Sequence, residues 1–333
     1  MHTEQRLIWF RRLGLGGAML AATVVVLGAW VRLTAAGLGC PDWPGCYGHV
    51  YPEAGHEFGR ALREMIHRYA ATSLGLIITT LAAWALINRR EPGQPLAVPI
   101  ALFAVVCVQG ALGALTVTLL LTPLVVTAHL LGGLTTLGLA SWLSMAPEGP
   151  VSGAPDRSLQ RFALAALAVL VLQTALGGWT SANYAALACP DLPTCQGSWW
   201  PSMDYRAAFR LSHGLGIDYE GGVLANPARM AIHFTHRAGA IVTALVLLSL
   251  AGSAWRRAPS CRLRHAARQL ALAVCVQIAS GVLMVRWNVP LPLATLHNAG
   301  AALLVITVVN LLRALWPAAD PTMLRLPDAG SAR

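Results

Sequence analysis

Four histidines stand at matching places within long apolar stretches of the chain: His67, His129, His236 and His297. In every case the third and fourth residues that follow are Gly or Ala. Residues three and four apart share one face of a helix, so each imidazole should lie beside a flat space that no bulky side chain fills. A porphyrin fits such a space, and imidazole is a common axial ligand of haem iron. The pattern predicts two bis-histidine haem sites, His67 with His129 and His236 with His297.

Two other interpretations of these histidines stay open. An imidazole inside a membrane helix can hydrogen-bond to a neighbouring helix, and small residues then serve close helix packing. Zinc is the other alternative, but two histidines at each site supply too few ligands unless carboxylates join them. Ionisable residues inside a membrane are costly and mark functional sites, and here they occupy duplicated positions. We therefore favour haem ligation.

A carboxylate distinguishes one pair of histidines from the other. Glu64 precedes His67 by three residues, and the matching position before His236 is His233. A carboxylate beside a metal site can act as a general base or stabilise developing positive charge. Glu64 is therefore a candidate catalytic residue. The alternatives are that Glu64 lies at the membrane surface and pairs with Arg63 or Arg68, and that His233 is an ordinary interfacial residue.

Arginines accompany the histidines. Arg68 and Arg237 each follow one of them directly, and Arg32 and Arg286 stand at the outer ends of apolar runs. A guanidinium group binds carboxylates in a bidentate manner, so haem propionates are plausible partners for these side chains. The alternative is that they extend from the helix ends toward water.

The composition already limits the class of protein. Of the 333 residues, 56% are hydrophobic and 11% are charged, whereas soluble domains carry about 25% charged residues. An ordinary soluble enzyme, a disordered chain and a nucleic-acid-binding protein are excluded on these grounds. All 24 basic residues are Arg, which excludes a lysine Schiff base or a lysine general base.

Eight apolar runs position the candidate residues. A membrane-spanning helix needs about 20 mostly apolar residues. Such runs occur at 13–33, 66–87, 97–119, 123–145, 161–181, 229–252, 266–286 and 291–315. We expect an all-α integral membrane protein with eight transmembrane helices. The first is retained, because no small-residue cleavage site follows it.

The sequence contains an internal duplication. Cys-Pro-Asp-Trp-Pro-Gly-Cys at 40–46 matches Cys-Pro-Asp-Leu-Pro-Thr-Cys at 189–195, and Val-Cys-Val-Gln occurs at both 106–109 and 274–277. We therefore expect two tandem four-helix bundles, 1–150 and 151–333. Each contains an even number of spans, so a pseudo-twofold axis along the membrane normal should relate them.

The distribution of arginine predicts the orientation. Fifteen of the 24 Arg residues lie in one alternating set of segments, which places both termini in the cytoplasm by the positive-inside rule. Loops 34–65 and 182–228 then face outward with the pairs Cys40/Cys46 and Cys189/Cys195, and an oxidising exterior preserves disulfides. A redox role and a structural role for these cysteines both stay open. No role follows from the sequence for segment 196–228.

These motifs together resemble the haem A synthase family from about residue 10 to residue 315. The resemblance rests on Leu-Gly-Ala-Trp-Val-Arg-Leu-Thr at 27–34, the first cysteine motif, Glu64-x-x-His67-Arg68, Thr127-Ala-His129 and His236-Arg237. It implies a bacterial inner (plasma) membrane enzyme that oxidises the C8 methyl group of haem O to a formyl group, giving haem A for cytochrome c oxidase.

The resemblance also assigns roles to the two halves. It implies that His67 and His129 hold the substrate haem O, that Glu64 is the essential carboxylate, and that His236 and His297 hold a permanent haem b. The cysteine pairs correspond to loop disulfides of the family. Membrane lipid and an upstream haem O synthase would be partners, while the electron acceptor and any homo-oligomer stay unidentified. The alternative function is a di-haem membrane cytochrome b that carries electrons from quinol.

Overall fold

The computed structural model describes residues 3–52, 55, 57–145, 156–214, 216–258 and 260–316. This part of the chain contains eight long helices. Each coincides with, or contains, one of the expected apolar runs to within one residue. They are α1 (Thr3–Leu33), α2 (Phe58–Ile87), α3 (Ala97–Thr118), α4 (Pro123–Ser144), α5 (Arg157–Ala182), α7 (Asn226–Arg257), α8 (Cys261–Arg286) and α9 (Leu291–Leu315). All eight are long and apolar enough to span a membrane. The prediction of an all-α, eight-span protein is confirmed.

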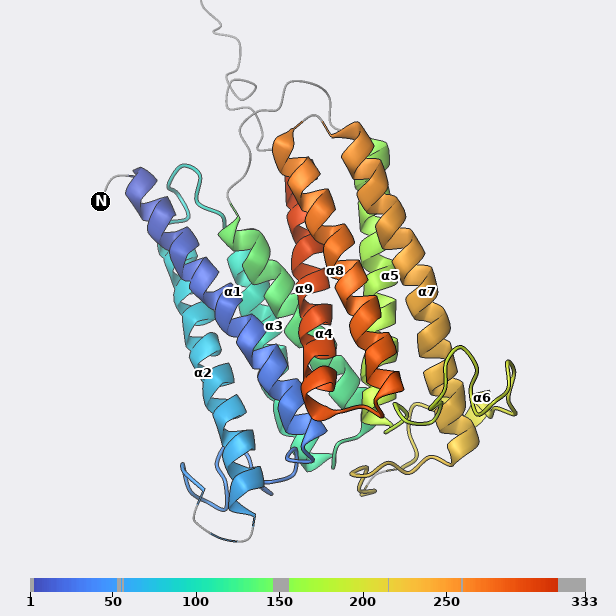
Figure 1. Ribbon diagram of the computed structural model, residues 1–333. Coiled ribbons are helices and arrows are strands. Elements are labelled where there is room, and N and C mark those ends of the chain that lie inside the picture. Colours follow the sequence, from blue (N-terminus) through green and yellow to red (C-terminus); the bar gives the residue numbers. More distant parts are fainter. Residues whose placement is uncertain are drawn as a thin grey trace, which may run out of the picture.

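The long helices form two groups that stand side by side (Figure 1). In the first group, α1 packs on α2, α2 on α3, α3 on α4 and α4 on α1. In the second, α5, α7, α8 and α9 close a ring in the same way. The helices that carry histidines, α2 with α4 and α7 with α9, therefore stand on the diagonals. The expected boundary at 150/151 lies outside the described residues.

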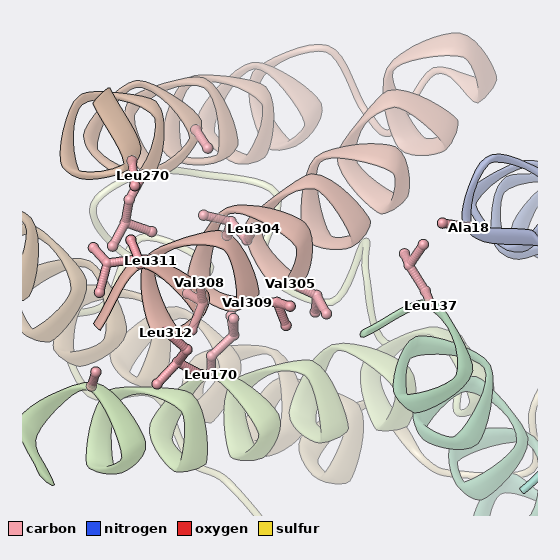
Figure 2. Close-up of a cluster of buried hydrophobic side chains, with 14 of the residues drawn as sticks. Ala18, Leu137, Leu170, Leu270, Leu304, Val305, Val308, Val309, Leu311 and Leu312 are labelled. Carbon is pink, nitrogen blue, oxygen red and sulfur yellow. The ribbon is translucent and has the colours of Figure 1, made fainter. Parts of the chain in front are cut away.

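The contacts between the two groups follow a reciprocal pattern. Helix α1 packs on α9, α4 packs on α5, and α4 packs on α9. A twofold axis between α4 and α9 would produce these pairings, and the axis itself stays a prediction. Figure 2 shows the core at this junction, where α9 inserts side chains such as Leu304, Val308 and Leu311 between the neighbouring helices. Helix α9 is the most deeply buried span.

Strained backbone positions are also duplicated. Left-handed φ is uncommon outside glycine. In the described chain, the non-glycine residues with positive φ form four pairs at the repeat spacing: Ala35 with Tyr184, Tyr47 with Gln196, Leu120 with Asn288, and Leu121 with Val289. The duplication therefore extends from sequence motifs to the local path of the backbone at the turns.

Helices α2 and α7 begin earlier than their apolar runs predict, at Phe58 and Asn226. The added residues of α2 include the charged side chains Arg60, Arg63 and Glu64, which contact neighbouring segments, whereas those of α7 are Asn226, Pro227 and Ala228. Arg60, for example, donates to the backbone oxygen of Ala35 at 2.6 Å. Apolar patterning did not locate these ends because charged residues interrupt the apolar run in α2, and because α7 begins with Asn226 and Pro227.

The loop between α5 and α7 reaches across to the first group of helices. It contains the short helix α6 (Tyr205–Ala208). Farther along, Tyr219 is 2% exposed, and its backbone N–H donates to the Leu120 oxygen at the α3–α4 turn at 3.1 Å. Glu220 forms an ion pair of 2.6 Å with Arg60 of α2. This loop, whose role the sequence did not indicate, joins the two halves at the end that carries the cysteine loops.

Candidate functional site

Each of the four histidine rings lies against a glycine of the neighbouring helix. A Cβ atom added to Gly28 would lie 3.0 Å from His67 Cε1, and one added to Gly281 would lie 3.1 Å from His297 Cε1. The other two pairs are His129 with Gly113 at 3.5 Å and His236 with Gly177 at 3.2 Å. Glycine therefore lets the imidazole ring approach the backbone of the adjacent helix closely, and this glycine–histidine contact occurs at all four histidines.

The structure brings the four imidazoles together in the expected pairs. His67 and His129 interact electrostatically across the first bundle, and His236 and His297 do so across the second. All four side chains are half-buried. In each bundle the two rings come from the diagonal helices, so they face one another across the interior.

Three glutamines occupy space that the sequence analysis assigned to a porphyrin. They are Gln109 on α3, Gln173 on α5 and Gln277 on α8, each four residues before the glycine that faces a histidine. Their side chains reach the glycine three residues beyond that histidine. A Cβ atom would lie 1.8 Å from the Gln109 amide at Gly132, 2.3 Å from Gln173 at Gly239, and 2.1 Å from Gln277 at Gly300.

The fourth position shows why this glycine is needed. Helix α1 carries Val24 in place of the glutamine, and α2 carries Ala70 in place of the glycine. The small residue three positions after the histidine therefore accommodates the glutamine wherever a glutamine is present. The recurring Gln-x-x-x-Gly spacing marks these glutamines in the sequence. Their contacts cannot be assigned from it, because they depend on which helix packs against which histidine.

The imidazoles of the two halves have different polar partners. In the second half, Gln173 Nε2 lies 3.0 Å from His236 Nδ1, and Ser280 Oγ lies 2.9 Å from His297 Nδ1. In the first half, the Nδ1 atoms of His67 and His129 are buried and have no hydrogen-bond partner. Buried polar atoms without partners are rare in folded proteins, so the first half holds two nitrogens whose bonding capacity is unused.

Glu64 is buried, with 4% of its surface exposed. Its Oε2 accepts from the Cys40 backbone N–H at 2.9 Å, and its Oε1 accepts from Arg68 Nη2 at 2.5 Å. Pairing with Arg68 was the alternative interpretation of this residue, and the structure shows that pair in a buried place. Arg63 instead lies over the Trp30 ring.

His233 makes the corresponding contact in the second half. It is buried, and its Nδ1 accepts from the Cys189 backbone N–H at 3.3 Å. Glu64 and His233 therefore bind the same loop position, the first cysteine of each motif. One half performs this task with a carboxylate and the other with an imidazole.

Arg68 and Arg237 hold the cysteine loops in place. Arg68 Nη1 donates to the Asp42 carbonyl oxygen at 2.9 Å. Arg237 donates to the carbonyl oxygens of Thr194 at 2.9 Å and Cys189 at 2.6 Å. Both guanidinium groups thus anchor the loops, and their expected contact with haem propionates stays a prediction.

Arg32 joins the two halves. It donates to the Ser181 carbonyl oxygen at the end of α5 at 2.8 Å, and its guanidinium lies 4.0 Å from the centre of the Tyr184 ring. The position matching Arg32 in the repeat is Ser181 itself, so this contact has no counterpart in the second half.

The cysteine loops are closed by disulfides and by an aspartate. The bonds are Cys40–Cys46 and Cys189–Cys195. In the first loop, Asp42 accepts hydrogen bonds from the backbone N–H groups of Gly48 and Tyr47. These bonds, chiefly the one from Gly48, lower the pKa of the Asp42 carboxyl group. In the second, Asp191 accepts from Thr194 Oγ1 and from two backbone N–H groups, which lowers its pKa to about 2.

The ligand set suits a porphyrin better than a free metal ion. Within the described residues, His, Cys, Asp and Glu side chains form no group of three or more that could hold a metal ion. A haem supplies four equatorial nitrogens of its own and requires only two axial ligands from the protein. Two imidazoles in each half fit that requirement.

The fold and the site together define a membrane protein of eight spans with a facing pair of imidazoles in each half. Residues 11–309 match the COX15-CtaA family, described as cytochrome oxidase assembly protein. The chain is 41% identical to the haem A synthase of Shewanella oneidensis, with 95% of this chain and 99% of the relative covered.

Haem A synthases of Rhodospirillum centenum and Shouchella clausii are 28% and 25% identical, each over 91% of this chain, with 87% and 94% of the relative covered. The chain belongs to the haem A synthase family. Membership makes it a multi-pass bacterial membrane protein and an oxidoreductase of haem A biosynthesis.

Proposed function

We propose that this protein oxidises the C8 methyl group of haem O to a formyl group by successive hydroxylations, and that haem A is the product. The observation that carries this proposal is the asymmetry of the two histidine pairs, together with the family to which the chain belongs. A substrate must enter and leave, whereas a cofactor stays. Two halves of one duplicated scaffold that hold their imidazoles differently suit these two tasks.

The first half is the substrate half in this proposal. His67 and His129 supply the axial nitrogens for haem O from α2 and α4. Neither Nδ1 atom has a hydrogen-bond partner, so neither ring is fixed by a second contact on that nitrogen. An imidazole without such a partner is a weaker and more easily exchanged metal ligand, which suits a site that releases its product.

Glu64 is the proposed catalytic carboxylate of this half. The hydrogen bonds to Cys40 and Arg68 fix both of its oxygens. It lies three residues before His67 on the same helix, and its task is to steer a proton or to stabilise positive charge at the methyl group being oxidised. His233, at the matching position, cannot supply negative charge, so the second half lacks this function.

In this proposal, His236 and His297 would hold a resident haem b in the second half. A bound haem b supplies one-electron redox chemistry. The protein contributes two imidazoles whose Nδ1 atoms have different polar partners: His236 Nδ1 accepts from the Gln173 amide, and His297 Nδ1 contacts the Ser280 hydroxyl. Helices α5, α8 and α9 supply an apolar surrounding.

The protein's surroundings follow from the same proposal. Both termini face the cytoplasm and the disulfide loops face outward, because arginine is concentrated in the segments on the side of the termini. An enzyme that makes haem O must act upstream, and an electron acceptor must take the electrons removed. The division into residues 1–150 and 151–333 assigns one haem to each half.

Haem extraction from protein purified after co-expression with a haem O synthase tests the function. We expect haem B together with haem O or haem A, separated by chromatography and identified by mass. Glu64→Gln should retain both haems and lose formyl production by about 100-fold or more, the usual scale for acid–base or electrostatic catalysis. His233→Gln is the matched control, with formyl production retained.

Two outcomes would contradict the proposal. Haem B alone in both halves would indicate a di-haem electron carrier. Full formyl production by the Glu64→Gln variant would remove that residue from the mechanism.

A further inference from the structure

Ser280 is a buried hydroxyl on α8 that the repeat does not share. It is 5% exposed and directly precedes Gly281, the glycine against which His297 packs. The matching position in the first half is Leu112, directly before Gly113. The ring-to-glycine contact is therefore common to both halves, while the hydroxyl beside it occurs in one.

The contacts of Ser280 determine which nitrogen of His297 carries the proton. Its Oγ lies 2.9 Å from the Gln277 carbonyl oxygen and 2.9 Å from His297 Nδ1. A carbonyl oxygen can only accept, and a hydroxyl has one proton to donate. Both contacts are hydrogen bonds only if Ser280 donates to Gln277 and accepts from an N–H at His297 Nδ1.

The other ring nitrogen then carries a lone pair. Gln277 Nε2 lies 3.3 Å from His297 Nε2 and can donate to it, which agrees with the same tautomer. The same amide also donates to the His297 backbone oxygen at 3.1 Å, so Gln277 keeps a partner when Nε2 is needed elsewhere. His297 is thus held with Nδ1 protonated and Nε2 available to a metal.

The first half lacks this arrangement. His129 Nδ1 is buried without a partner, and Leu112 has no hydroxyl to offer it. Partners on the distal nitrogen fix the tautomer and orientation of a metal-binding histidine, and their loss costs about 10–100-fold in metal affinity. The two halves therefore differ in how firmly their α4 and α9 imidazoles are prepared for iron.

We propose that Ser280 is the positioning residue that makes the haem of the second half resident, and that leucine at the matching position keeps the first half exchangeable. This inference rests on the proposed haem b of the second half. It assigns the difference between cofactor and substrate sites to one hydroxyl that orients a ligand without touching the haem iron.

The test measures how fast haem leaves the purified holoprotein. Excess apomyoglobin serves as the acceptor, and the transfer of haem B is followed in the visible spectrum. Ser280→Ala should release haem B about 10–100-fold faster than the wild type, with a shifted midpoint potential. Ser280→Thr retains the hydroxyl and should restore slow release. An unchanged release rate and potential in Ser280→Ala would overturn the proposal.

A reciprocal variant tests the idea without disturbing the second half. Leu112→Ser should slow the loss of haem O from the first half, because the new hydroxyl can accept from His129 Nδ1. If Ser280→Ala does not yield folded protein, Leu112→Ser decides the matter, and an unchanged haem O release rate contradicts the proposal.

The His236→Ala variant separates a failure of the haem b assignment from a failure of the role proposed for Ser280. Retention of haem B in that variant would remove the haem b assignment itself. Loss of haem B there, combined with normal release in Ser280→Ala, would remove only the role of Ser280.

Discussion

The two halves of this protein position four imidazoles in the same way and surround them differently. In each half the ring lies against a glycine of the adjacent helix. In the second half, a glutamine and a serine contact the Nδ1 atoms, and an imidazole binds the cysteine loop. In the first half, the Nδ1 atoms have no partners, and a carboxylate binds the loop. The backbone repeat thus fixes where a ligand stands, while single side chains decide what the site does.

Removing the histidines tests this comparison most severely. His236→Ala or His297→Ala should abolish binding of the proposed haem b, because each removes one of the two imidazoles proposed to hold it. His67→Ala or His129→Ala should leave haem b bound and prevent haem O binding and formyl production. Haem content by chromatography, together with the reduced-minus-oxidised spectrum, distinguishes the two patterns. Equal loss of haem B from variants of either half would break the comparison.

The glycines that accommodate glutamine allow a finer test. Gly300→Ala and Gly239→Ala place a Cβ atom within 2.1 and 2.3 Å of the Gln277 and Gln173 side chains. Each amide must move away from its histidine, so we expect destabilisation by about 1–3 kcal/mol, the usual cost of overpacking. Thermal unfolding in detergent measures it. Gly252→Ala is the matched control, because no atom lies within 4 Å of the added Cβ.

The first half offers the converse change. Ala70→Gly on α2 removes a methyl group at the one of the four positions where the matching residue of the adjacent helix is Val24 and not a glutamine. We expect only the intrinsic helix cost of glycine, about 1 kcal/mol.

The result that would contradict the glycine prediction concerns Gly300→Ala. If this variant unfolded at or above the midpoint temperature of Gly252→Ala, the glutamine contact would not require glycine.

The smallest expected effect concerns the loop aspartates. Asp191 has its pKa lowered from 3.8 to about 2, so folding holds the charged form more favourably than the unfolded chain does. Its contribution to stability is present above the unfolded value and is lost as the pH falls through the folded value. Asp191→Asn should reduce the loss of thermal stability between about pH 4 and pH 2.

Asp42 also has a lowered pKa but has no hydroxyl partner corresponding to Thr194. Asp42→Asn should therefore change the pH profile less than Asp191→Asn does. The reverse order, measured as unfolding temperature against pH, would contradict the hydrogen-bond account of the two loops.

The sequence alone predicted the eight spans, the duplication and the four facing histidines. Apolar runs of this length have few other stable structures, and the histidines recur at fixed distances from the repeated motifs. It also identified Glu64 and His233 as the point where the halves diverge. These features follow from local sequence patterns that can be recognised without knowing how the helices pack.

The sequence did not reveal the partners of these residues. The roles of Gln173, Gln277 and Ser280 depend on which helix packs against which histidine. The contacts of Arg68 and Arg237 with loop carbonyl oxygens were hidden as well, because only the folded loop presents those acceptors. The destination of the α5–α7 loop was hidden for the same reason, because its contacts lie about a hundred residues or more away along the chain.

That loop ties the two groups of helices together at the end that carries the cysteine motifs. Its Glu220 binds Arg60 on α2, and its Tyr219 binds the α3–α4 turn at Leu120 with its side chain fully buried. Any widening between α2 and α3 at this end must break the ion pair or withdraw the tyrosine. Separation of the first group of helices at this end therefore pulls on the loop, whose continuous backbone leads into α5 and α7 of the second group.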